Sequence, residues 1–151
     1  MIRIITKALA LSVLLGLISC DKKNECKSTE LIVKSLEIEY GCANTRYGLQ
    51  IDLSENYTII RTQQDFENKV SGNCIPKIDF SSYDLVIGKK GLNRGNASID
   101  YNLIRDCANI LKLQVTFNQS LTLNAPIVTY HALVPKLGDE ETVTVEFVYK
   151  N

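Results

Sequence analysis

Imidazole chemistry in this chain would depend on His131, because it is the only histidine among 151 residues. His131 lies inside the apolar run 127–134 (IVTYHALV), where a histidine is more often packed or hydrogen-bonded than used as a general base. The sequence contains no G-x-S-x-G, no H-E-x-x-H and no P-loop, the motifs of a serine nucleophile, a zinc protease and a phosphate cradle. The histidine therefore gives no reason to expect an enzyme.

Carboxylate chemistry is the remaining catalytic possibility. Two carboxyl groups suffice for glycoside hydrolysis, and the chain has 17 acidic residues. These acids are scattered, and their spacing singles out no pair, so solvated strand faces are the simpler explanation. A hydrolase with a carboxylate site that the sequence does not reveal stays open as an alternative function.

The first of five cysteines, Cys20, stands where an apolar segment ends and a polar one begins. Residues 8–19 (ALALSVLLGLIS) carry no charge and follow a cationic start with Arg3 and Lys7. As a helix they would span about 18 Å, which is too short for a bilayer core of about 30 Å but typical of a signal peptide. Residues 17–20, Leu17-Ile18-Ser19-Cys20, resemble the lipobox of bacterial lipoproteins. The resemblance implies removal of residues 1–19 and acylation of Cys20.

Lipidation would attach the protein to the cell envelope of a Gram-negative bacterium, because several acyl chains together form a stable membrane anchor. Residues 20–28 would be a charged tether, and residues 29–151 a single domain. An acidic residue such as Asp21 after the acylated cysteine retains some lipoproteins on the inner membrane, whereas other bacteria use a charge-rich start as a surface-export signal. We expect the outer membrane or the cell surface.

Four cysteines remain for the domain, and an even number in an exported protein predicts disulfides. No C-x-x-C spacing occurs, so we expect no zinc site, no redox pair and no cofactor. A predicted hairpin of residues 83–87 and 98–104 would bring Cys107 within disulfide distance of Cys74. We therefore predict a Cys74–Cys107 bridge and, by exclusion, a Cys26–Cys42 bridge. The second bridge requires a break in the strand predicted before Cys42.

The glycine-containing loop 88–96 (GKKGLNRGN) is the best candidate for a binding site. Its glycines would let backbone amides approach an anion, and Lys89, Lys90 and Arg94 would supply positive charge. The alternative is a solvated hairpin tip whose lysines prevent edge-to-edge pairing.

Strands are predicted by the alternation of apolar and polar residues that runs through most of the domain. About eight strands are predicted in this way or as apolar runs, at residues 31–40, 49–53, 57–61, 83–87, 98–104, 111–117, 127–134 and 143–149. The first three strands would form a meander. The run 127–134 has no clean polar face, which predicts a strand buried on both sides or covered by a helix.

One short helix is predicted at about residues 63–70. Thr62 would cap its start, Phe66 and Val70 share one face, and Gly72 suits a left-handed end. Because strands and helices do not alternate, the domain is predicted to be mainly β, an antiparallel β-sandwich or a partly open barrel.

Length and charge agree with one such domain. Removal of residues 1–19 leaves 132 residues, enough for a hydrophobic core. These residues carry 15 basic and 17 acidic side chains, a formal charge of −2. No basic stripe is present, so we expect no nucleic-acid partner.

Part of the domain resembles a known family. The C-terminal domain of the PrcB family is similar to four segments of this chain: residues 78–88 (IDFSSYDLVIG), the strands at 97–104 and 111–117, and residues 129–136 (TYHALVPK). The similarity covers about residues 57–136 and consists mostly of apolar strand positions. Residues 92–95 (LNRG) depart from the Thr-Gly-Gly-Tyr-like run of the family, so no function of that loop is carried over.

The PrcB family takes its name from a protein that stabilises a bacterial surface protease complex. The resemblance therefore implies a non-catalytic domain that acts on a partner protein. Together with the lipobox, it predicts a lipid-anchored binding or accessory module for another envelope protein. The alternative is an envelope hydrolase with a carboxylate site.

Overall fold

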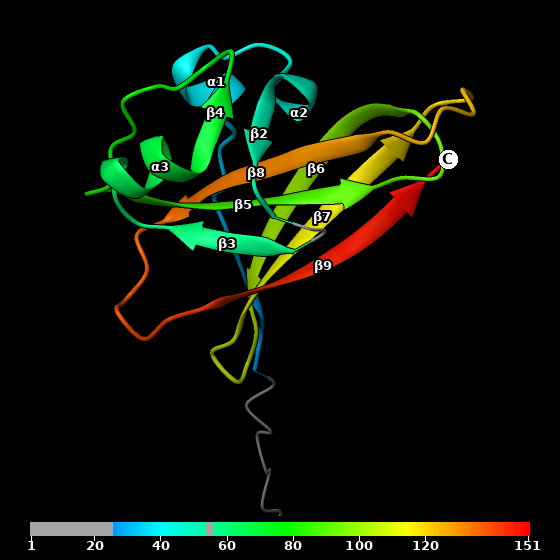
Figure 1. The fold of residues 1–151 in the computed structure, drawn as a ribbon. Coiled ribbons are helices and arrows are strands. Elements are labelled where there is room, and N and C mark those ends of the chain that lie inside the picture. Colours follow the sequence, from blue (N-terminus) through cyan, green and yellow to red (C-terminus); the bar gives the residue numbers. More distant parts are fainter. Residues whose placement is uncertain (1–25, 54–55) are drawn as a thin grey trace, which may run out of the picture.

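Three sheets build the part of the chain that this computed structural model describes, residues 26–53 and 56–151 (Figure 1). Sheet A has the strand order β1-β6-β7-β9, and these strands are Thr29–Leu31, Asn96–Arg105, Leu111–Gln119 and Val143–Lys150. Sheet B has the order β3-β5-β8, with strands Tyr57–Ile60, Tyr83–Gly91 and Ile127–Pro135. The predicted signal peptide, the predicted lipidation site Cys20 and the first part of the predicted tether lie outside the described residues.

A third layer covers the outer face of sheet B. It consists of a two-stranded sheet, β2 (Leu49–Ile51) with β4 (Val70–Gly72), and three short helices. The helices are α1 (Leu36–Tyr40), α2 (Thr45–Gly48) and α3 (Gln63–Lys69). None of these helices is long and apolar enough to cross a membrane, and the described residues contain no other helix. The prediction of a mainly β domain, a sandwich or open barrel, is confirmed.

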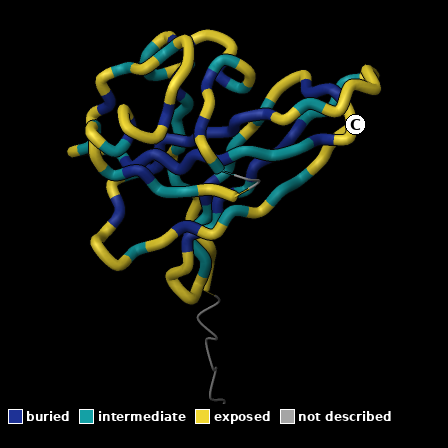
Figure 2. The backbone as a smooth tube through the Cα atoms, viewed as in Figure 1, coloured by how far each residue is buried: buried dark blue, intermediate teal, exposed yellow. Residues whose placement is uncertain are grey.

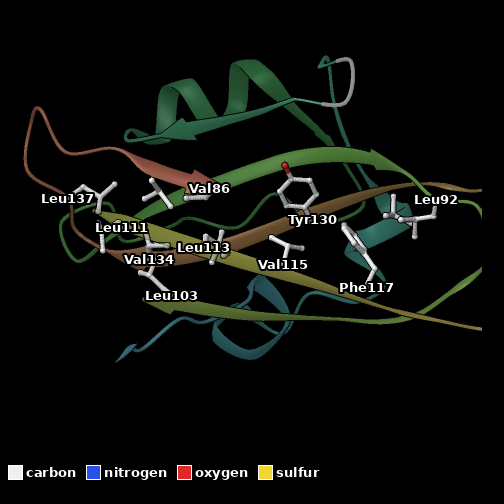
Figure 3. Close-up of a cluster of buried hydrophobic side chains, with 13 residues drawn as sticks. Val86, Leu92, Leu103, Leu111, Leu113, Val115, Phe117, Tyr130, Val134 and Leu137 are labelled. Atoms are coloured by element: carbon white, nitrogen blue, oxygen red, sulfur yellow. The ribbon is translucent and has the colours of Figure 1, made fainter. Parts of the chain in front are cut away.

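Sheets A and B pack face to face around the larger of two hydrophobic cores (Figure 3). Phe117 of β7 and Tyr130 of β8 are fully buried there, with ring centroids 6.2 Å apart in an edge-to-face arrangement. Buried positions lie along the central strands, whereas most of the loops are exposed (Figure 2). Burial of these side chains supplies the main favourable free energy of folding, at about 25 cal/mol per Å² of apolar surface.

The second core lies between sheet B and the helical layer. Leu85 and Leu133 of sheet B pack there with Leu36 of α1, Leu49 of β2 and Phe66 of α3. β8 thus contributes residues to a core on each face, as the mostly apolar run 127–134 predicted.

The predicted helix is confirmed as α3. The Thr62 hydroxyl accepts a hydrogen bond from the Asp65 amide at 3.1 Å, as expected of an N-cap. The predicted end at Gly72 is wrong, because the chain is already extended at Val70. Gly72 instead lies in β4 with φ 140°, where a Cβ atom would be 2.1 Å from the Gly48 carbonyl oxygen.

The first predicted strand is wrong over residues 36–40, which form α1. The Ser35 hydroxyl accepts from the Ile38 amide at 3.3 Å, and Gly41 ends the helix with φ 68°. These N- and C-terminal caps outweigh an alternating pattern that is only five residues long. The predicted meander is wrong too, since β1 pairs with β6, β2 with β4, and β3 with β5.

The predicted hairpin of residues 83–87 and 98–104 is also wrong. β5 pairs with β3 and β8 in sheet B, whereas β6 pairs with β1 and β7 in sheet A. The chain crosses between the sheets at residues 92–95. β9 pairs parallel to β7, so sheet A is not purely antiparallel. Alternation predicts which residues face the core, but it does not say which strands are neighbours.

Two disulfides are present as predicted in number, but both predicted pairings are wrong. The bridges are Cys26–Cys107 and Cys42–Cys74, each with Cα atoms 5.7 Å apart. The Cys74–Cys107 prediction depended on the hairpin that does not form. Thr29 pairs with Arg105 instead, which places Cys26 beside the β6–β7 turn. Cys42 follows α1 and reaches Cys74 in the helical layer.

Candidate functional site

The two main sheets are not joined at the outer edges of β6 and β8. β1 pairs only with the last three residues of β6. The outer edge of β8 has one isolated strand bridge in the described chain, between Leu133 and Lys34. Between these contacts the Tyr101 side chain of β6 spans the gap to β8. Its hydroxyl accepts a hydrogen bond from the His131 amide at 2.9 Å. We call this gap the seam.

A pocket of about 630 Å³ opens at the seam. Its walls are the segment before α1, the two helices α1 and α2, residues 98–101 of β6, and Thr129 of β8. Its volume is in the range of small-ligand sites. Its lining is mixed, with both charged and apolar side chains.

Three polar side chains from separate elements meet beside this pocket: Glu37 of α1, Thr45 of α2 and His131 of β8. The Thr45 hydroxyl donates to Glu37 Oε1. His131 Nε2 lies 2.6 Å from Thr45 Oγ1 and 3.5 Å from Glu37 Oε2. Because the hydroxyl has one proton and donates it to Glu37, the Nε2 nitrogen is the donor toward Thr45. The network ties both helices to sheet B.

The network also keeps Glu37 ionised. Partial burial opposes its ionisation, but the adjacent His131 imidazole and the hydrogen bond from Thr45 outweigh that effect and lower its pKa to about 2. The Glu37 side chain is 37% exposed, whereas His131 is almost completely buried. The pocket wall therefore presents a stable negative charge to solvent.

The three groups do not have the geometry of a nucleophilic triad. In a triad the carboxylate bonds to the histidine nitrogen opposite the one that faces the nucleophile. Here Thr45 and Glu37 both lie at Nε2, and the buried Nδ1 has no hydrogen-bond partner among the described residues. Thr45 is also only 1% exposed. The arrangement therefore lacks both an accessible hydroxyl and an orienting acid.

The two basic side chains of the pocket already have partners. Lys34 forms an ion pair with Glu39 at 2.6 Å, and this hydrogen bond raises the lysine pKa. Arg46 donates to the Ala97 carbonyl oxygen. By contrast, neither Glu37 nor Asp100 forms an ion pair with a lysine or arginine of the described chain. The charged side chains of the lining that form no ion pair with an oppositely charged lysine, arginine or acid are therefore Glu37 and Asp100, which are negative, and Arg46, which is positive, so the balance is negative.

The structure separates the residues of the predicted binding loop. Lys89 and Lys90 belong to β5, where successive side chains point to opposite faces. Lys90 lies over the Phe147 ring, 5.3 Å from its centroid, and lines a second pocket together with Arg94. Lys89 does not line that pocket. The three cations do not form one binding surface.

Sequence reasoning missed Glu37, because α1 was expected to be a strand with Glu37 on a solvated face. The signal for this short helix is a pair of capping residues six positions apart, Ser35 at its start and Gly41 at its end. No motif or spacing in the sequence singles out Thr45 as a site residue. The apolar run around His131 predicts a packed or hydrogen-bonded ring, and the structure confirms that His131 is buried and hydrogen-bonded.

No group of three histidine, cysteine or acidic side chains suited to a metal ion is found where the structure is described. Comparison of the chain with protein-family models, with curated proteins and with solved structures finds no match. The resemblance to the PrcB family stays a prediction from the sequence.

Proposed function

We propose that this protein is a lipid-anchored binding module of a bacterial cell envelope that acts on another envelope protein. The observation that carries the proposal is the pocket at the seam, where an ionised Glu37 lies beside a strand edge that has no strand partner among the described residues. Ionised groups and free strand edges are means of recognising protein partners. The buried position of Thr45 favours binding over nucleophilic chemistry.

The Cys26–Cys107 bridge supports a role close to the membrane. It joins the start of the described chain to the turn between β6 and β7. If Cys20 is acylated, the six residues to Cys26 allow a reach of about 20 Å. The domain would then stay near the bilayer, where it can meet a partner of the same membrane.

Affinity capture tests this proposal. The oxidised full-length chain in detergent, with a C-terminal tag, is incubated with envelope extract of the source bacterium, alongside Glu37→Gln and a Lys90→Ala/Arg94→Ala double variant. We expect one protein to be retained by the wild type and by the double variant but lost with Glu37→Gln. A partner retained equally by all three would place the contact elsewhere. Retention of nothing by any of them would contradict the proposal.

A second candidate is an envelope hydrolase, because Glu37 and Asp100 both line the pocket. Glycoside hydrolysis requires one ionised and one protonated carboxyl group. The ionised state of Glu37 suits a nucleophile or a base. Turnover of aryl glycosides or peptidoglycan that disappears in both Glu37→Gln and Asp100→Asn, with the fold retained, would favour this candidate.

A further inference from the structure

We infer that the pocket at the seam binds an extended peptide, which pairs with the free edge of β6 and places a lysine or arginine side chain against Glu37. The inference rests on the proposed function and specifies the part of the partner that is recognised. Three features of the described residues support it: a short free strand edge, its recessed position and the charges around it.

The free edge is defined by what holds the two ends of β6. At the C-terminal end, β1 pairs with residues 103–105. At the N-terminal end, Arg46 and Tyr47 of α2 donate to the Ala97 and Asn96 carbonyl oxygens. Residues 98–102 have β7 on one side and no strand on the other within the described chain. This stretch is about 16 Å long, enough for five residues of an added strand.

The free edge of β6 is protected by its position in the pocket, unlike the edge of an exposed strand. Free edges are usually guarded by lysine, proline or a bulge against pairing with other sheets. An irregularity in β6 lies only at the start of this stretch, between Asn96 and Ser98, and residues 98–102 (SIDYN) contain neither lysine nor proline. The edge instead lies within the pocket, between the segment before α1 and helix α2. A single peptide strand fits such a recess, whereas a second sheet does not, so the position selects for β-strand addition.

The charges favour a basic side chain on that peptide. Lys34 pairs with Glu39, and Arg46 keeps its charge but is held at the Ala97 carbonyl oxygen, so neither forms an ion pair with Glu37. Asp100 adds a second carboxylate at the rim, where it accepts a hydrogen bond from the Asn118 amide nitrogen at 2.7 Å. A lysine or arginine would give Glu37 the cationic partner that the described chain does not supply.

Selection from a peptide library tests the inference. Phage-displayed octapeptides of random sequence are selected on the oxidised full-length chain in detergent, and separately on Glu37→Gln. We expect the wild type to enrich lysine or arginine at one fixed position, and Glu37→Gln to lose this enrichment. Exposed Glu140, in the turn before β9, provides the matched control variant Glu140→Gln, which should behave as the wild type.

Backbone N-methylation of the best peptide then tests strand addition without any change to the protein. Alternate amides of an added strand face the edge of β6, so methyl groups on one alternating set should weaken binding at least about tenfold, and those on the other set should not. Glu37→Gln should weaken binding of the unmethylated peptide by about tenfold. Amide chemical shifts of residues 98–102 should move on binding.

Several results would overturn the inference: no enriched basic position, equal effects of both methylated sets, or equal affinity for Glu37→Gln and Glu140→Gln. Binding of spermidine in place of any peptide would identify a small-cation site and overturn it as well. If affinity capture retains a partner but no peptide is selected, the proposed function stands and this inference fails. If peptides bind as expected but nothing is captured from the envelope, the inferred peptide site stands and the proposed action on an envelope protein fails.

Discussion

The two faces of β8 carry different residues and contribute differently to the molecule. On the face toward sheet A, Val128, Tyr130 and Ala132 are fully buried, and their side chains form no hydrogen bond with the described residues. On the other face, the Thr129 hydroxyl donates to the Leu49 carbonyl oxygen at 2.8 Å, and His131 bonds to Thr45. The apolar face stabilises the fold without specifying partners, whereas the polar face holds the helices that build the pocket.

The largest expected effect is on the apolar face. Phe117→Ala should lower the free energy of unfolding by about 3–5 kcal/mol, because it removes a fully buried aromatic ring and leaves a cavity beside Tyr130. Urea denaturation followed by circular dichroism measures the change. Phe147→Ala, at a partly buried position of the same core, is the control and should cost less. Equal losses in the two variants would contradict this account of the core.

The Cys42–Cys74 bridge should contribute most to the helical layer. Cys42→Ser together with Cys74→Ser should lower the free energy of unfolding by about 2–4 kcal/mol. Hydrogen exchange should show the larger part of the loss in α1 and in β4 rather than in β7. Mass spectrometry of peptides from the oxidised protein checks the pairing itself, and a Cys74–Cys107 peptide would contradict it.

Thr45→Val removes one hydroxyl from the polar face. It leaves Glu37 and His131 without the group that joins them, so we expect a loss of about 1–3 kcal/mol in the free energy of unfolding. The same variant should weaken capture of the envelope partner, because α2 is no longer fixed to β8. Unchanged stability would mean that the network does not hold the helix.

The Glu37 carboxylate makes stability depend on pH in acid. Its pKa falls from 4.5 to about 2 on folding, so its contribution is complete above about pH 4.5 and is lost as the pH falls toward 2. Because the side chain is 37% exposed, we expect about 1 kcal/mol. In Glu37→Gln the stability difference between pH 7 and pH 3 should shrink by a little over half of this amount, because a group with a pKa of about 2 is still mostly ionised at pH 3. Urea titrations at both pH values measure it, and an unchanged difference would count against the ionised state.

The smallest effect is expected from a hydroxyl on the apolar face. The Tyr130 hydroxyl is buried and has no hydrogen-bond partner in the described chain. Tyr130→Phe should therefore leave the free energy of unfolding unchanged or raise it by up to about 1 kcal/mol, the opposite sign to Thr45→Val. Thermal denaturation of the two variants side by side checks this contrast. A clear loss for Tyr130→Phe would show that the two faces do not differ in this respect.

The same contrast explains what could be predicted from the sequence. Residues 111–117 alternate over seven positions, and residues 127–134 are mostly apolar with no clean polar face, so local pattern sufficed to predict both strands and the burial of the second. The capping residue Thr62 similarly sufficed for α3. These features depend on neighbours along the chain.

The site and the disulfides depend on contacts between distant residues, which the pattern does not contain. Thr45 and His131 are 86 positions apart, and Cys26 and Cys107 are 81 apart. Both contacts follow from the crossing between sheets at residues 92–95, which the sequence presented as a hairpin loop. α1 does not follow from the pattern, because its five residues alternate like a strand and only the caps at Ser35 and Gly41 favour a helix.

Photo-crosslinking inside the source bacterium tests most directly whether the seam is the surface that contacts a partner. The full-length chain would carry benzoylphenylalanine in place of Asp100 at the pocket rim or, as a control, of exposed Glu67 on α3. We predict one discrete adduct with an envelope protein from position 100, lost when Glu37→Gln is added, and no such adduct from position 67. The same adduct from both positions, or none from position 100, would contradict the account.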